Sequence, residues 1–286
     1  IQATFISLPS EIIIEIIRYL NRTDRQNLGH THDRLRDIEE KAGYHRFNII
    51  EFNRGIRAFD GSRIFSSDEI FPDGKIAYSF KHATTEQLII RDQLSMDAEE
   101  KLRVFLKTIH FKELDFEITS ETSCRIFEDA VQNRQGIKNI SIRTSMERIN
   151  IEENRIRQLI LCLPSMQKCL IMPSSIHRSA PIIDDETFLH IVHASSSNTH
   201  LSGWCAITAA GLAAAFEIVC SGQSARYICC SVNNREMNVF CNQLDAQFEF
   251  ASGHIKHRQS GAKMAVYWNA SHECLVRMYW APPVVQ

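Results

Sequence analysis

The sequence carries almost no excess charge of either sign and contains no long apolar run. It has 32 Lys and Arg against 34 Asp and Glu, giving a formal net charge of −2 at pH 7. Because nucleic acids and anionic membranes attract basic proteins, this balance argues against both as partners. No apolar run approaches the roughly 20 residues of a membrane span, and the first residues lack the basic and apolar regions of a signal peptide. We therefore expect a protein of the cytosol or nucleus that binds other proteins.

Common catalytic and metal-binding patterns are also missing. The chain has no P-loop, no G-x-S-x-G, no H-E-x-x-H and no dinucleotide fingerprint. Its nine cysteines are odd in number and form no C-x-x-C pair, which predicts small core side chains rather than disulfides or zinc ligands. Two histidine pairs, His190 with His193 and His254 with His257, have no third ligand beside them. We expect no catalytic residue, metal or cofactor.

Residues 8–20, LPSEIIIEIIRYL, carry more isoleucine than one buried helix face requires. At 100° per residue, the apolar side chains cover an arc of roughly 220°, whereas a helix on one core needs a stripe of about 100°. Pro9 and Glu11 suit a first helical turn, because the missing N–H costs nothing there and the carboxylate meets the positive helix end. The second apolar side must be covered by more of the chain or by a partner.

Two further short helices are predicted before residue 45, and together the three bury too little surface to stand alone. The spacing L-P-x-E-I followed by I-I-x-x-L, with an Asp and a Leu at fixed offsets behind it, resembles the F-box motif. The resemblance implies a three-helix module, residues 1–45, that binds a Skp-type adaptor and a cullin scaffold in a ubiquitin ligase of the SCF type. The residues implied to bind the adaptor are Leu8, Pro9, Glu11, Ile12, Ile16, Ile17, Leu20, Asp24, Leu28 and Leu35.

The motif departs from the family at Gly29-His30-Thr31-His32, where most F-boxes carry apolar residues. Two alternatives therefore stay open. One is a scaffold that binds proteins but no ligase because its F-box is degenerate. The other is a helical segment buried in a larger core, since isoleucine-rich helices are common inside proteins.

Residues 46–100 have a different residue pattern, in which alternating runs such as FNIIEF are interrupted by turn-forming residues such as Asp60-Gly61. They predict a small strand pair or meander, then a helix, linking the two main parts. From residue 101 to 286 short strands and helices alternate. Strands are expected at ELDFEI from Glu113, NISIR from Asn139, KCLIM from Lys168, LSGWCAI from Leu201 and YICCSV from Tyr227.

Helical spacing of i, i+3, i+4 and i+7 recurs between these strands, beginning at Ile156, Leu212 and Met237. Asp184-Asp185-Glu186 could pair as catalytic carboxylates, but its place before FLHIV favours helix capping. The fold class expected is α/β, an F-box followed by an irregular β-α repeat domain that resembles a leucine-rich-repeat solenoid. The last residues, from Lys263, predict a hairpin that caps the final repeat.

A parallel sheet with helices on one face leaves the other face free to bind a target protein. If Leu114, Phe116 and Ile118 point inward, then alternate side chains point outward. An alternative is that Trp204 is buried and the charged side chains are merely solvated. A further one is an enzyme with its site at the carboxyl ends of the strands. The candidate target-binding residues are Trp204, Tyr227, Glu113, Asp115 and Arg143.

Overall fold

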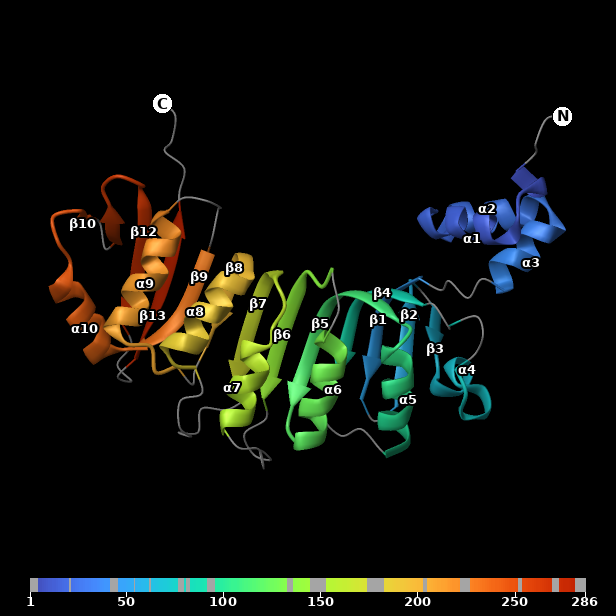
Figure 1. The fold of residues 1–286 in the computed structure, drawn as a ribbon, viewed down its shortest axis with the longest axis horizontal. Coiled ribbons are helices and arrows are strands. Elements are labelled where there is room, and N and C mark those ends of the chain that lie inside the picture. The colour runs from blue at the N-terminus through green and yellow to red at the C-terminus, as the bar shows by residue number, and fades with distance from the viewer. Residues whose placement is uncertain are drawn as a thin grey trace. The chain divides into compact units, whose positions relative to one another are not determined.

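The computed structural model forms two compact units, Ile1–Lys112 and Glu113–Gln286, and both mix helices with strands (Figure 1). No helix among the described residues is both long enough and apolar enough to cross a membrane. The boundary between the units falls within one strand, and each unit is described by itself. The described residues are 5–20, 22–41, 46–53, 55–61, 63–76, 80, 83–91, 96–132, 136–144, 153–173, 183–202, 205–221, 227–251, 254–268 and 273–280.

The first unit begins with three short helices, as the sequence predicts. A 3-10 turn, η1 (Phe5–Ser7), precedes α1 (Ser10–Tyr19), α2 (Arg22–Thr31) and α3 (Asp33–Lys41). Their apolar stripes meet in one small core, in which α1 and α2 both pack against α3. The fully buried members of this core are Ile13, Ile17, Leu35 and Ile38, and Phe5, Ile6, Leu8, Ile14 and Leu28 pack around them half-buried.

The rest of the first unit is a small sheet covered by phenylalanines. Its strands β1 (Arg46–Phe52), β2 (Ile56–Asp60), β3 (Arg63–Phe65) and β4 (Thr84–Ile90) lie in the order β4-β1-β2-β3. The predicted meander is present, because β1, β2 and β3 pair antiparallel, and β1 also pairs parallel with β4. Phe47 stacks on Phe80 and meets Phe65 edge-on. The helical segments are α4 (Ser67–Ile70), η2 (Pro72–Gly74) and α5 (Met96–Leu106).

The second unit begins with five parallel strands, each followed by a helix. Every strand pairs parallel with the next one along the chain, with one shift of register between β7 and β8 near Met166. The helices lie along one face of the strands (Figure 1). The strands are β5 (His110–Ile118), β6 (Asn139–Thr144), β7 (Met166–Pro173), β8 (Ser195–Leu201) and β9 (Tyr227–Asn233). The helices are α6 (Glu121–Val131), α7 (Glu153–Leu161), α8 (Asp185–Ala194), α9 (Ala209–Cys220) and α10 (Asn234–Gln243).

One predicted strand is wrong. The sequence LSGWCAI suggests a strand beginning at Leu201, but Leu201 is the last residue of β8, which is built from the polar run SSSNTHL. Ser195, Thr199 and Leu201 of this strand are nevertheless buried. Hydropathy alone misses such a strand because its buried positions are not apolar.

Four antiparallel strands complete the second unit. They are β10 (Phe248–Ala251), β11 (His254–His257), β12 (Ala262–Trp268) and β13 (Glu273–Trp280). The predicted terminal hairpin is present, since β12 and β13 pair from Ala262 with Trp280 to Trp268 with Cys274. Its expected turn, 269–271, lies outside the described residues. The hairpin joins the sheet because β13 pairs antiparallel with β9.

Acidic side chains tie the helix starts of the second unit together. Asp184 caps α8 by accepting from the Thr187 N–H at 3.0 Å, which confirms the predicted capping role. Asp185 accepts from both the N–H and the hydroxyl of Thr208, the cap of α9. Glu236 of α10 accepts from the Ala209 N–H at 3.0 Å. Carboxylates at these positive helix ends both satisfy free N–H groups and bind consecutive helices to one another.

The Asp184 cap predicts a specific loss of stability in acid. Burial raises the pKa of Asp184, but hydrogen bonds from Thr187 and the nearby Arg157 outweigh it, so the pKa lies below its ordinary value of 3.8. Because its pKa is lower in the folded protein than in the unfolded chain, ionised Asp184 stabilises the fold at pH values above the unfolded-state pKa. This stabilisation is lost as the pH falls through the folded-state pKa. Asn keeps an oxygen that can cap the helix and removes only the charge, so in urea unfolding we expect Asp184→Asn to cost about 0.5 kcal/mol at pH 7 and less at pH 3. An equal cost at both pH values would contradict the assignment.

Candidate functional site

The helix α1 presents two apolar sides, and only one of them is used inside the three-helix module. Ile13 and Ile17 are buried in the module core, whereas Ile12 is 48% exposed and Ile16 38% exposed. The last two lie one turn apart, on the same side of the helix. Large apolar side chains left in water at this spacing form the kind of stripe that a partner helix covers.

The other residues predicted to contact an adaptor surround this stripe. Ile17 and Leu35 are buried in the module core. They support the helices that carry the stripe and are not exposed to a partner. Leu8, Leu20 and Leu28 are half-buried, and Pro9, Glu11 and Asp24 are exposed. Pro9 is the N-cap residue directly before α1, and its carbonyl accepts from the N–H groups of Ile12 and Ile13 at 3.1 Å each.

Arg34 of α3 holds the segment that precedes α1. Its guanidinium donates to the carbonyl of Ile6 and, at 3.0 Å, to the carbonyl of Leu8. These carbonyls belong to a turn that has few hydrogen bonds of its own, so Arg34 fixes the approach to Pro9. This role of Arg34 could not be predicted from the sequence, because a surface arginine on a polar helix face is normally solvated.

Residues 29–32 join the end of α2 to the start of α3. Gly29 is buried, and a methyl group added there would lie 3.7 Å from the Arg36 Cα, an ordinary contact. His30 and His32 are exposed, and the His32 Nδ1 accepts from the Arg34 N–H at 3.1 Å. His32 therefore caps the start of α3 by accepting a hydrogen bond from a free N–H group of the first turn.

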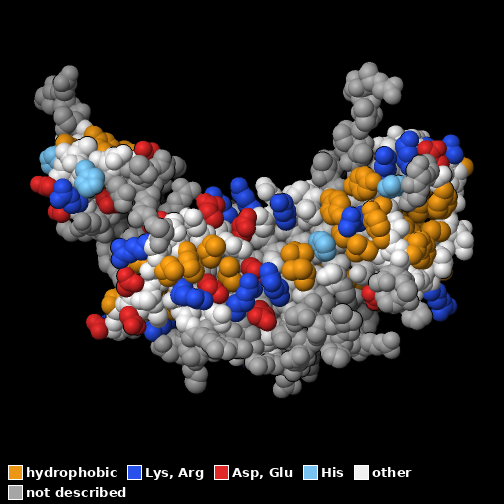
Figure 2. Space-filling view, turned by 180° about the vertical axis from the view of Figure 1, so that it is seen from behind, with side chains coloured by type: hydrophobic (Ala, Val, Ile, Leu, Met, Phe, Trp, Pro, Cys, Tyr) orange, Lys and Arg blue, Asp and Glu red, His pale blue; other side chains and the backbone are white. Residues whose placement is uncertain are grey.

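The second candidate surface is the face of the second unit that carries no helix. Leu114, Phe116 and Ile118 point toward the helices and are buried, as predicted. Alternate side chains therefore line the opposite face, which Figure 2 shows from behind Figure 1. We call it the open face; its side chains in β5 and β6 are Glu113, Asp115, Glu117, Asn139, Ser141 and Arg143.

The charged residues predicted on β5 and β6 bind one another. Arg143 donates from Nε and Nη2 to the two Asp115 oxygens at 3.1 Å each. Asn139 donates to Glu113 at 2.5 Å. Asp115 is only 5% exposed, so Arg143 covers it from solvent. These side chains close the sheet surface and leave little free hydrogen-bonding capacity for a target.

Tyr227 lies on the open face at the far side of the parallel strands, half-buried and opposite Tyr279 of β13. Trp204 lies outside the described residues. So do the segments 145–152 and 174–182, which follow β6 and β7 in the sequence.

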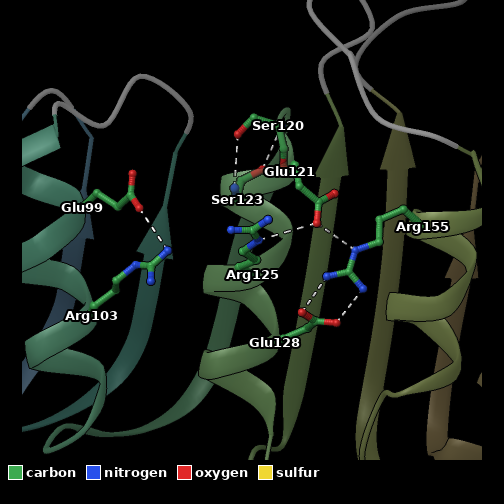
Figure 3. Close-up of polar contacts among 8 residues, drawn as sticks. All are labelled: Glu99, Arg103, Ser120, Glu121, Ser123, Arg125, Glu128 and Arg155. Carbon is green, nitrogen blue, oxygen red and sulfur yellow. Dashed lines mark hydrogen bonds and ion pairs between the residues drawn. The ribbon is translucent and has the colours of Figure 1, made fainter.

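The helix-covered side of the second unit carries an ion-pair network between α6 and α7 (Figure 3). Arg155 donates to both oxygens of Glu128, at 2.8 and 2.7 Å, and to Glu121 at 3.2 Å. These hydrogen bonds, above all those to Glu128, raise the pKa of Arg155. Arg125 lies 3.8 Å from the same Glu121, so two arginines face two glutamates, which is typical of a structural contact between neighbouring helices.

The buried thiols are poor nucleophiles. Burial raises the pKa of Cys169 and of Cys205 to about 12 each, so both stay protonated near neutral pH. Within the described ranges, no group of three or more His, Cys, Asp or Glu side chains is placed to hold a metal ion.

Comparison with known proteins adds no relative. No protein-family model matches the chain, and no curated protein sequence matches it.

Proposed function

We propose that this chain is a substrate-receptor subunit of an SCF-type cullin-RING ubiquitin ligase. In this proposal the helices α1 to α3 are an F-box that binds a Skp-type adaptor, and the β-α succession after them is a leucine-rich-repeat-like domain that holds a target protein. The observation that carries the proposal is α1, whose residues match the motif and whose Ile12 and Ile16 remain exposed after the module core is complete.

A receptor of this kind needs no catalytic group of its own. Holding a target near a charged ubiquitin carrier converts transfer into an effectively intramolecular step. The chain would supply two binding surfaces, the Ile12 and Ile16 stripe for the ligase and the open face for the target. The distribution of side chains supports this division, since the apolar stripe and the open face belong to different parts of the fold.

The test is co-expression with a Skp-type adaptor, followed by affinity measurement by isothermal titration calorimetry. We expect a stable complex that the double variant Ile12→Ser, Ile16→Ser weakens about thirtyfold. Covering the exposed part of each isoleucine contributes about 1 kcal/mol, and about 2 kcal/mol corresponds to this factor. Because both side chains are exposed, the variant should keep its fold by circular dichroism.

Ile64→Ser is the matched control, since Ile64 of β3 is also exposed on the first unit but lies far from α1 in sequence. It should bind the adaptor as the wild type does. If the wild type does not bind the adaptor at all, the ligase assignment fails.

A protein-binding scaffold without a ligase is the second candidate, favoured by the exposed His30 and His32 where the family carries apolar residues. The same titration separates the two. If the wild type does not bind the adaptor but the His30→Leu variant does, the chain has a degenerate F-box.

A further inference from the structure

The open face of the second unit carries a cluster of tyrosines around one arginine, on strands β9, β12 and β13. Tyr227 lies opposite Tyr279, and two residues along the same strands Cys229 lies opposite Arg277. Tyr267 of β12 lies diagonally beside Arg277, whose guanidinium carbon is 4.8 Å from the Tyr267 ring centre. Neighbouring strands therefore place three phenol rings within reach of one guanidinium.

Basic side chains extend this cluster on both sides. His200 of β8 lies opposite Cys229, and Lys168 of β7 lies in the row that continues through Asn198 to Tyr227. On the other side, Lys263 of β12 lies opposite Tyr279. The Arg277 surface is defined here as Lys168, His200, Tyr227, Lys263, Tyr267, Arg277 and Tyr279.

Few carboxylates balance these charges. Among the described residues, Lys168, Lys263 and Arg277 form no ion pair, although ion pairs are frequent elsewhere on the chain. The acidic Glu249 of β10 is engaged by Lys256 at 3.5 Å. Glu273 lies four residues before Arg277 on β13, roughly 13 Å away along an extended strand. The surface thus has a local excess of positive charge on a chain whose formal net charge is −2.

Ordinary solvation does not account for this composition. Lysine is common on any solvated sheet face, but tyrosine and arginine together are enriched at the centres of protein interfaces. The contact with the Tyr267 ring restrains the Arg277 guanidinium, which lowers the entropy that a partner must remove when it binds. Figure 2 shows hydrophobic side chains gathered with basic and histidine side chains on this face of the second unit.

We propose that the Arg277 surface binds an acidic segment of a partner protein, with carboxylates on Arg277 and Lys263 and apolar side chains against the tyrosine rings. The proposal rests on the proposed function in that the acidic segment would belong to the target of the ligase. Charge complementarity selects this occupant, because a basic or neutral segment would leave three cationic groups unpaired beneath it. An arginine fork also matches a carboxylate better than any neutral group.

The test uses the full chain without an adaptor and three fluorescein-labelled decapeptides. One alternates glutamate with leucine, the second lysine with leucine, and the third glutamine with leucine. In fluorescence anisotropy titrations, the dissociation constant of the acidic peptide should be at least tenfold lower than those of the other two peptides. Its affinity should fall as sodium chloride rises from 0.05 to 0.3 M, because exposed charge pairs are screened.

Variants locate the binding surface. Arg277→Gln with Lys263→Gln should weaken the acidic peptide at least tenfold, and Arg277→Lys alone should weaken it less, because it keeps the charge but loses the fork. Lys75→Gln with Lys107→Gln is the matched control, since both lysines are exposed on the first unit. This control removes the same net charge and should change affinity less than twofold.

Equal binding of the acidic and basic peptides, or unchanged binding by the Arg277 and Lys263 variant, would overturn the proposal. Tighter binding of a labelled ten-residue oligothymidylate would also overturn it, and would indicate a nucleic-acid surface. The adaptor titration is independent of these measurements. If the chain binds the acidic peptide but not the adaptor, the Arg277 surface stands and the ligase role fails. If the chain binds the adaptor but not the peptide, the ligase role stands and the proposal of an acidic target fails.

Discussion

Gly211→Ala is expected to lower the free energy of unfolding by about 2–3 kcal/mol, the cost of overpacking combined with the loss of a helix cap. A methyl group added to Gly211 would lie 2.1 Å from the Asp185 Oδ1 and 2.4 Å from its Cγ. Asp185 cannot retreat without giving up its hydrogen bonds to Thr208 at the start of α9. Urea unfolding followed by circular dichroism measures the loss, which runs against the usual preference of helices for alanine.

A double-mutant cycle identifies the cause. Asp185→Gly removes the side chain that the new methyl group would strike, so Gly211→Ala in that background should be neutral or stabilising by up to about 1 kcal/mol. Ala213→Gly tests the helix itself, because Ala213 is half-buried two residues along α9. It should cost about 1 kcal/mol. A Gly211→Ala penalty of the same size in both backgrounds would show that Asp185 is not the reason.

Arg143→Leu should destabilise the second unit by about 2–3 kcal/mol, because it leaves the nearly buried Asp115 carboxylate without its bidentate partner. The loss should stay below the largest costs known for breaking a fully buried ion pair, because the Arg143 side chain is 45% exposed and water can partly replace it. Arg143→Lys should recover only part of the loss, because an ammonium group cannot donate the two parallel hydrogen bonds.

Lys112→Leu is the comparison on β5, the strand that carries Asp115. Lys112 pairs with Glu86 at 2.8 Å, but both side chains are 46% exposed, so the loss should stay well below 1 kcal/mol. Because the Arg277 surface shares no residue with the Asp115 pair, Arg143→Leu should leave peptide affinity unchanged at a temperature where the variant is folded. A tenfold loss of peptide affinity would instead make Arg143 part of the binding surface.

Much of the fold could be predicted from the sequence because it depends on periodicity. The helical stripes from Leu212 and Met237, and the alternation around Phe116, each describe one element and its buried face, which is a local property. The polar strand β8 could not be predicted in the same way, since its buried Ser195 and Thr199 have no apolar signature. The antiparallel strands β10 and β11 were missed because they are only four residues long.

The candidate sites were less predictable, because they depend on pairings between distant segments. The split of α1 into buried Ile13 and exposed Ile12 needs the position of α3, and the sequence showed only that the isoleucines were too many for one face. Tyr227 was anticipated on the open face, but its cross-strand partner Tyr279 and the diagonal neighbour Arg277 come about 50 residues later and reach it through an antiparallel register. Cross-strand register of that kind is not encoded in either segment alone.

The pairing of β13 with β9 has a consequence for synthesis on the ribosome. Each parallel strand from β5 to β8 gains its next neighbour after one intervening helix, but β9 ends at Asn233 and its antiparallel partner begins only at Glu273. At about 5–20 residues per second, the edge of β9 stays open for roughly 2–8 seconds after it emerges. During that interval its unpaired backbone can template the wrong strand, so the nascent chain is most vulnerable to misassembly just before its last hairpin is complete.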